Sequence, residues 1–349
     1  MTTRTDDTYL WLDRYAARLG FERLSARLPW DVPPSYLYGV LLILVIDPVL
    51  NAWAHASGYR SVFLDNPYFV LQPLALVASI YASRSLVQSY DDVMTEMAVE
   101  ERTDSPERLT EIVPDWLPWA VFAVGAGYLY VSTFATGLDA IYRTDGPVGV
   151  FAGLVINPLV WVPIAAQFLS VYLSLELLAP YRLVTSDVGI HFYDPEGLGG
   201  LRPIGELLKQ AYYFMMLGLI CYALILYHPL AEVQGLERSP LTDVTFTAIW
   251  VVTIATVAFA VFTLHRFMHR EKRAELQALE AELRSYVDNP WDVKHRTVPD
   301  GDADRVAELQ RRMEIVSGTN EYPATFSIWS QLLLAVVLPK GVQLFLSGL

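Results

Sequence analysis

The sequence predicts an all-α integral membrane protein with seven transmembrane helices, and three observations support this fold class. The 349 residues are 53% hydrophobic and have a mean hydropathy of +0.31, which is too apolar for an ordinary soluble domain. Seven apolar runs of about 20 residues or more are each long enough to cross ~30 Å of hydrocarbon. Lys and Arg gather in the segments on one side of these runs and are scarce on the other.

The chain is acidic, with a formal net charge of -13 and a pI of about 4.9. Acidic loops of this kind indicate a halophilic protein, because at molar salt the Debye length is only ~3 Å and the self-repulsion of the loops is screened. No patch is basic enough to predict a nucleic-acid partner. The single cysteine, Cys221, lies in an apolar run, which excludes a disulfide within the chain and a cysteine-based metal site.

Residues 1–34 form the predicted cytoplasmic N-terminal segment. Leu, Tyr and Arg follow one another there in the pattern of an amphipathic helix, which would either lie on the membrane surface or pack as an ordinary N-terminal helix. Residues 35–269 hold the first six predicted spans. We place the seven apolar runs near 36–56, 67–88, 116–138, 148–179, 206–228, 245–267 and 323–346.

The orientation follows from the charges between the spans. The N-terminal segment and the even-numbered loops share one side of the membrane and carry 21 Lys and Arg residues, whereas the opposite side carries 3. The positive-inside rule therefore predicts a cytoplasmic N-terminus, an external C-terminus and a multi-pass protein of the cell membrane. The split also supports the number of spans, because one span more or fewer would scramble it.

A cytoplasmic helical hairpin over 270–318 is predicted between spans six and seven. The sixth apolar run continues into a charged helix without Pro or Gly, and Asn289-Pro290-Trp291 breaks this helix. Apolar residues on each side of the break recur at spacings of three and four, the period of one helix face. These residues are Leu276, Leu279, Leu283 and Tyr286 before the break and Val306, Leu309, Met313 and Val316 after it. Residues 319–349 then hold the seventh span.

Asp47 and Asn51 are candidates for binding a ligand or an ion in the first span. An ionisable residue inside a span is costly and therefore points to function. The two residues are four apart and share one helix face, and Pro48 frees a backbone carbonyl near them. The alternative is a structural carboxylate that a neighbouring span satisfies.

The fourth span is broken by Asn157-Pro158 and Pro163. Broken helices at membrane depth are tolerated where they pack in protein or line a wet cavity. Asn157 would then face the same cavity as Asp47, and the alternative is a plain proline kink. Glu176, near the cytoplasmic end of this span, is expected to be an interfacial carboxylate paired with Arg182.

A Gly-rich cytoplasmic loop at 183–203 contains His191, Asp194 and Glu196. These three groups could hold a metal, but such a set in a turn is common by chance, and a rigid turn that docks on the hairpin is the preferred interpretation. We predict no metal site and no cofactor.

Polar residues follow one face of the seventh span at spacings of three and four, which is typical of a pore lining. Lys340 would either snorkel to the membrane surface or tune an ion path. The pore-lining candidates are Ser327, Ser330, Gln331, Lys340 and Gln343.

No enzyme is predicted. The sequence has no Gly-x-Ser-x-Gly, no His-Glu-x-x-His, no phosphate loop and no Asp-rich metal motif. His265 and His269 share a helix face, but no acid follows them in a catalytic pattern.

The architecture resembles the seven-transmembrane ion channels of insect odorant and gustatory receptors. The resemblance lies in the seven spans, their orientation and the helical extension before the last span, and Gln343-Leu344-Phe345 is similar to the end of the family's C-terminal pattern. It implies a homotetramer in the lipid bilayer, with 270–318 as the central anchor and 323–346 as the pore helix. It also implies a pocket for a small molecule or an ion, with candidates Asp47, Asn51, Tyr130 and Trp161.

Two other function classes stay open. The broken fourth span is also compatible with a transporter of ions or small molecules. The hairpin is also compatible with a non-conducting sensor or scaffold. A pore predicts an oligomer, a transporter predicts a cavity within one chain, and a scaffold predicts neither.

Overall fold

The computed structural model describes residues 10–65, 67–103, 106–227, 240–287, 302–322 and 337–346. These residues form helices joined by turns, and no strand occurs among them. Short helices precede and connect the long ones: α1 (Trp11–Arg18), α2 (Phe21–Ser25), α5 (Val62–Asp65), η2 (Pro67–Val70), α7 (Val99–Arg102) and α8 (Glu107–Thr110).

Six helical stretches in the described chain are long and apolar enough to cross a membrane. The chain is therefore a multi-pass membrane protein. The stretches are Pro34–Ala56 (α3 Pro34–Gly39, η1 Val40–Ile46, α4 Asp47–Ala56), Tyr68–Glu96 (mainly α6, Leu71–Glu96), Trp116–Thr136 (α9), Leu138–Thr185, Arg202–Tyr227 (α13) and Asp243–Arg284, which is part of α15 (Pro240–Arg284).

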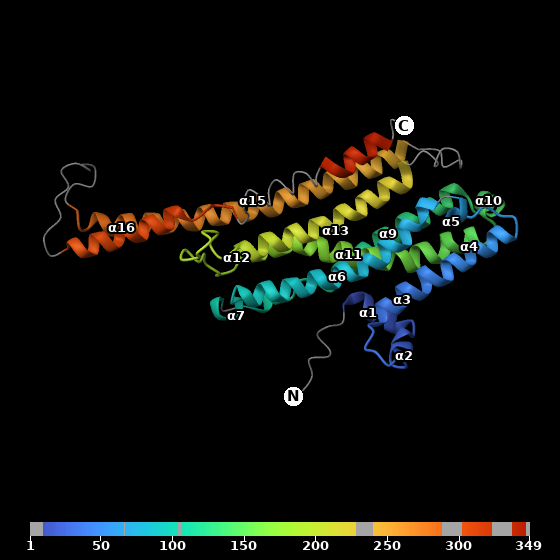
Figure 1. Cartoon of the computed structure of the whole chain (residues 1–349), viewed down its shortest axis with the longest axis horizontal. Helices are drawn as coiled ribbons and strands as arrows, with labels where there is room; N and C mark the ends of the chain where they lie inside the picture. Colours follow the sequence, from blue (N-terminus) through green and yellow to red (C-terminus); the bar gives the residue numbers. More distant parts are fainter. Residues whose placement is uncertain are drawn as a thin grey trace.

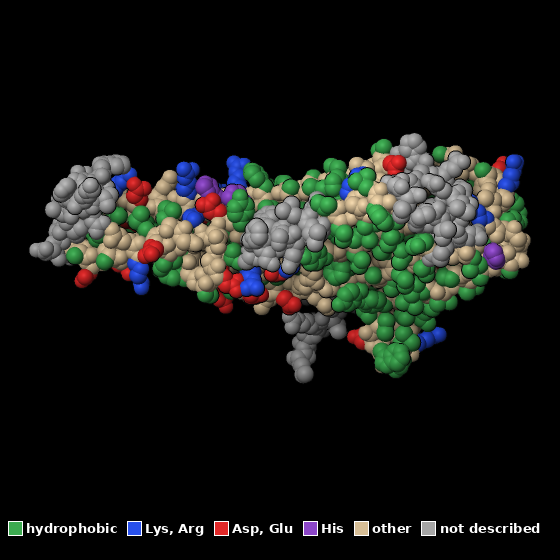
Figure 2. All heavy atoms as spheres, turned by 45° about the horizontal axis from the view of Figure 1, so that its top comes forward, with side chains coloured by type: hydrophobic (Ala, Val, Ile, Leu, Met, Phe, Trp, Pro, Cys, Tyr) green, Lys and Arg blue, Asp and Glu red, His purple; other side chains and the backbone are tan. Residues whose placement is uncertain are grey.

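The six stretches run side by side, and α15 extends well beyond the others at one end (Figure 1). Hydrophobic side chains dominate the surface of the bundle, whereas charged side chains gather toward the end where α15 projects (Figure 2). Of the predicted seventh run, residues 323–336 lie outside the described residues, and Val337–Leu346 form a short apolar helix.

The fourth stretch is a helix of 48 residues, much longer than the predicted run. It comprises α10 (Leu138–Phe151), η3 (Ala152–Trp161), α11 (Val162–Leu173), η4 (Ser174–Leu178) and α12 (Ala179–Thr185), and η3 and η4 are π-helical. It bends at Gly146, whose φ of 68° suits glycine. A Cβ atom at Gly146 would lie 2.6 Å from the Tyr59 ring, so this bend also needs the smallest residue.

The N-terminal helix α1 packs into the bundle instead of lying apart from it. Trp11 and Leu12 are buried in a cluster with residues of α3, η1, α6, η3 and α11. The backbone N–H of Leu12 donates to Gln167 Oε1 at 3.0 Å. Asp13 forms an ion pair with Arg84 of α6 and accepts hydrogen bonds from the N–H groups of Leu10 and Ser35. Of the two predicted alternatives, a helix on the membrane surface or a packed N-terminal helix, the structure shows the packed helix.

The predicted apolar stripes of the hairpin contact each other. Helix α16 (Ala303–Gly318) lies antiparallel to the projecting end of α15 (Figure 1), since Arg305 pairs with Glu282 and Lys272 reaches Thr319. The seam between the helices contains Leu279, Leu309 and Val316, with Leu276, Leu283, Tyr286 and Met313 at its border. The predicted break at Asn289-Pro290-Trp291 lies outside the described residues.

Candidate functional site

A polar centre inside the bundle is the best candidate for a functional site. Asp47, the first residue of α4, is 2% exposed. Its Oδ1 accepts a hydrogen bond from Asn51 Nδ2 at 3.1 Å. Its Oδ2 is buried, and among the described residues the Trp161 indole is the one further donor near the carboxylate. The predicted pairing of Asp47 with Asn51 on one helix face is thus present.

Trp161 of η3 lies on the second side of this centre, and Asn157 lies four residues before it on the same segment. Segment η3 packs against the first span, and the Trp161 indole lies within interacting range of the Asp47 carboxylate. Asn157 Oδ1 is buried and has no hydrogen-bond partner among the described residues. The two residues are four apart, so the same face of η3 carries them. Unsatisfied buried polar atoms are rare in proteins and call for an explanation.

Tyr130, another predicted ligand residue, has a structural partner. The Tyr130 hydroxyl donates to the carbonyl of Leu154 at 3.1 Å. The carbonyl of Leu159 accepts hydrogen bonds from Tyr38 at 2.7 Å and from Tyr15. Tyrosine hydroxyls therefore occupy two backbone carbonyls of η3, and these two carbonyls already have hydrogen-bond donors.

The chemistry of the polar centre suits a small cation. Its buried acceptors include the oxygens Asp47 Oδ2 and Asn157 Oδ1, and hard cations prefer oxygen ligands. Among the described residues, no Lys or Arg forms an ion pair with Asp47. The aromatic face of Trp161 could also contact a cation. Both neighbouring helices have π-helical turns here, η1 and η3, and such turns are frequent at functional sites.

The structure corrects the expected pairing of Glu176 with Arg182. Glu176 is fully buried, and neither of its carboxylate oxygens has a hydrogen-bond partner in the described part of the chain. Arg182 donates to the carbonyl of Glu111 instead. The cause is the length of the helix, which runs on to Thr185 and keeps Glu176 inside the bundle, near Tyr172 and Tyr212.

Two of the predicted pore-lining residues contact helices of the same chain. Lys340 Nζ donates to Thr247 Oγ1 at 3.1 Å and lies over the rings of Phe246 and Trp250. Gln343 is 6% exposed, and its Oε1 has no hydrogen-bond partner. Both side chains point toward the bundle. The other candidates, Ser327, Ser330 and Gln331, lie outside the described residues.

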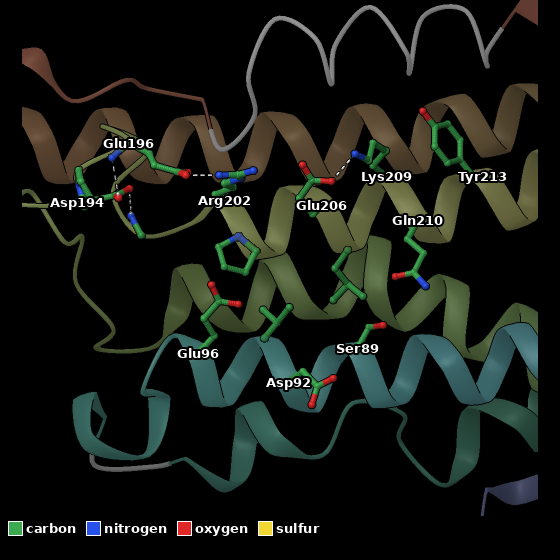
Figure 3. Close-up of a pocket in the computed structure, with 15 residues that line it drawn as sticks. Ser89, Asp92, Glu96, Asp194, Glu196, Arg202, Glu206, Lys209, Gln210 and Tyr213 are labelled. Carbon is green, nitrogen blue, oxygen red and sulfur yellow. Dashed lines mark hydrogen bonds and ion pairs between the residues drawn. The ribbon is translucent and has the colours of Figure 1, made fainter.

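A surface groove of about 800 Å³ lies between α6, α13 and the Gly-rich loop (Figure 3). The two basic side chains that line the groove form ion pairs with neighbouring acids, Arg202 with Glu196 and Lys209 with Glu206. Asp92 and Glu96 of α6 face them across the groove. Exposed ion pairs of this kind contribute little to stability. We therefore propose no functional site in this groove.

Asp194 organises the Gly-rich loop. Its carboxylate accepts hydrogen bonds from the backbone N–H groups of Glu196, Leu198 and Gly200. Burial acts to raise the pKa of Asp194, but these three hydrogen bonds favour the charged form and hold the pKa below its usual range. The Gly197 carbonyl accepts from the N–H of Asn320 at 2.7 Å. The loop is therefore the rigid turn docked on the hairpin.

One acidic residue at the base of the hairpin is not among the residues predicted from the sequence. Glu321 lies beside His265 and His269, although 52 residues separate it from His269. The spacing of the two histidines was visible in the sequence. Their partner was not, because only the return of the chain along α15 brings Glu321 to them.

Comparison with known proteins gives no match: no family model, no curated protein and no solved structure is similar to this chain.

Proposed function

We propose that the chain crosses the cell membrane seven times, with a cytoplasmic N-terminus and an external C-terminus. The seventh span would comprise 323–346, of which Val337–Leu346 is helical. The charge split of 21 to 3 supports this orientation. Single cysteines at Ser105 and Ser347 in a Cys221→Ser background should react with impermeant reagents from opposite sides. Labelling of both from one side would contradict the topology.

We propose further that the protein is a cation channel or ligand sensor of the seven-transmembrane type. The single observation that carries this proposal is the polar centre, where two buried oxygens, Asp47 Oδ2 and Asn157 Oδ1, have no donor among the described residues besides the Trp161 indole beside Asp47. A bound cation would satisfy the two oxygens and balance the charge of Asp47. The resemblance to insect receptors supports a channel that assembles as a homotetramer around the hairpins, with the lipid bilayer as its surroundings.

A transporter is the second candidate, and the interrupted fourth span favours it. Segment η3 is π-helical beside Asp47 and contains Pro158, and transporters bind coupling ions at broken helices. The two candidates differ in assembly and in transport. A channel needs several copies and conducts passively, whereas a transporter works as a single chain and couples the flux to a second solute.

Cation uptake into proteoliposomes tests the role of the polar centre. Asp47→Asn keeps the shape of the side chain and removes its charge, so uptake should fall by at least about tenfold, the equivalent of ~1.4 kcal/mol. Asp139→Asn is the matched control, because Asp139 is an exposed acid on the same long helix as η3, and it should retain the uptake of the wild type. Equal uptake by the wild type and Asp47→Asn would contradict the proposal.

A further inference from the structure

The segment that follows α16 returns along α15 and is held there by several hydrogen bonds. Lys272 Nζ donates to the carbonyl of Thr319 at 2.7 Å. The N–H of Asn320 donates to Gly197 of the Gly-rich loop, also at 2.7 Å. The base of the hairpin, the loop and α15 therefore meet at these residues.

Two histidines of α15 contact Glu321 in this segment. His265 Nδ1 lies 2.8 Å from the carbonyl oxygen of Glu321. His269 Nδ1 lies 3.0 Å from Glu321 Oε2, and Lys272 Nζ lies 3.6 Å from Oε1. A carbonyl and an ionised carboxylate only accept hydrogen bonds, so Nδ1 of both histidines carries a proton. Each histidine is positively charged only when its second ring nitrogen, Nε2, also carries a proton.

Tyr322 adds a ring contact to the same cluster. Its ring stacks on His265 with centroids 4.2 Å apart and planes 9° apart. Tyr322 is the last described residue before 323, where the predicted seventh span begins. The two histidines thus hold the two residues that lead into that span.

The charges at this cluster make the contact sensitive to pH. The groups that face Glu321 are His269, Lys272 and His265, all from α15. The hydrogen bond from His269, with the nearby positive charges, holds the pKa of Glu321 below its usual range. Glu321 therefore stays ionised in mild acid, where histidine side chains take up their second proton. Hydrogen bonds between two charged groups are roughly twice as strong as neutral ones.

We propose that His265, His269 and Lys272 form a protonation-dependent clamp on Glu321 and Tyr322, which fixes the start of the last apolar segment to α15. The clamp is tight below the pH at which histidine loses its charge, and it loosens as the pH rises through that range. It concerns how this segment is held and does not depend on conduction.

Spin labels on Arg273→Cys and Asn320→Cys, in a Cys221→Ser background, measure the clamp directly. Both positions are exposed, one on α15 and one beside Glu321. Distances are recorded by electron spin resonance on the full chain in nanodiscs at about pH 5.5 and about pH 8.5, on either side of the histidine range. We expect one narrow distribution in acid and a broader distribution in base.

Two variants and a control complete the test. Glu321→Gln should give the broader distribution at both pH values, and His269→Gln, which keeps a donor but cannot become charged, should lose most of the pH response. Glu282→Gln removes the same charge from a different ion pair of the hairpin, that with Arg305, and should respond like the wild type. A wild-type distribution that does not change with pH, or a full response in Glu321→Gln, would overturn the proposal.

Discussion

Asp13→Ala should destabilise the folded protein by about 3 kcal/mol, because it leaves the Arg84 guanidinium buried without its counter-charge. The Asp13 side chain is fully buried and that of Arg84 is 13% exposed. The variant also removes the acceptor for the N–H groups of Leu10 and Ser35. The loss of helical signal on heating in detergent measures this effect.

Two further variants separate the ion pair from other causes. Asp115→Ala breaks the exposed pair with Arg14 and should change stability by less than about 1 kcal/mol, as exposed pairs do. Arg84→Met in the Asp13→Ala background removes the unpaired charge and should recover part of the loss. If Asp13→Ala alone is as stable as the wild type, the buried pair does not anchor α1 to the bundle.

Leu309→Asp should separate α16 from α15. Leu309 is fully buried at the centre of the hairpin seam, which contains few other apolar side chains. The variant loses the burial of a leucine and places an unpaired carboxylate there, at a cost of at least about 3 kcal/mol. A hairpin held by such a narrow seam cannot absorb this cost and should open while the bundle stays folded.

Spin labels on Glu275→Cys and Glu314→Cys, in a Cys221→Ser background, measure the opening as a longer and broader distance distribution. Ala307→Asp is the control, because it adds the same charge at an exposed position of α16. It should cost about 0.5 kcal/mol in helix propensity and keep the wild-type distances. Unchanged distances in Leu309→Asp would show that contacts other than the seam hold the hairpin.

The helices and the hairpin seam could be predicted because their signals are local. The apolar runs predict helices of spanning length, and the spacing of Leu276, Leu279, Leu309 and Met313 predicts which faces meet. The bounds of the fourth span were predicted less accurately. The helix runs from Leu138 to Thr185 and exceeds the predicted run of 148–179 at both ends.

The candidate site could be predicted only in part. Asp47 and Asn51 are recognisable together because four residues separate them on one helix. The partners of Tyr130 and Arg84 are not recognisable, because their contacts join helices far apart in the chain. The same holds for Glu321, which no helical period connects to His269.

The central claim is that the polar centre at Asp47 binds a small cation, and binding to the purified protein tests it most directly. Thermal unfolding is compared in NaCl or KCl and in N-methylglucamine chloride of equal ionic strength, so that screening stays constant. At a cation concentration of 100 times Kd, wild-type protein should gain about 2.7 kcal/mol of stability. Asp47→Asn should lose this gain and Asp139→Asn should keep it. An equal gain in the wild type and in Asp47→Asn would contradict the claim.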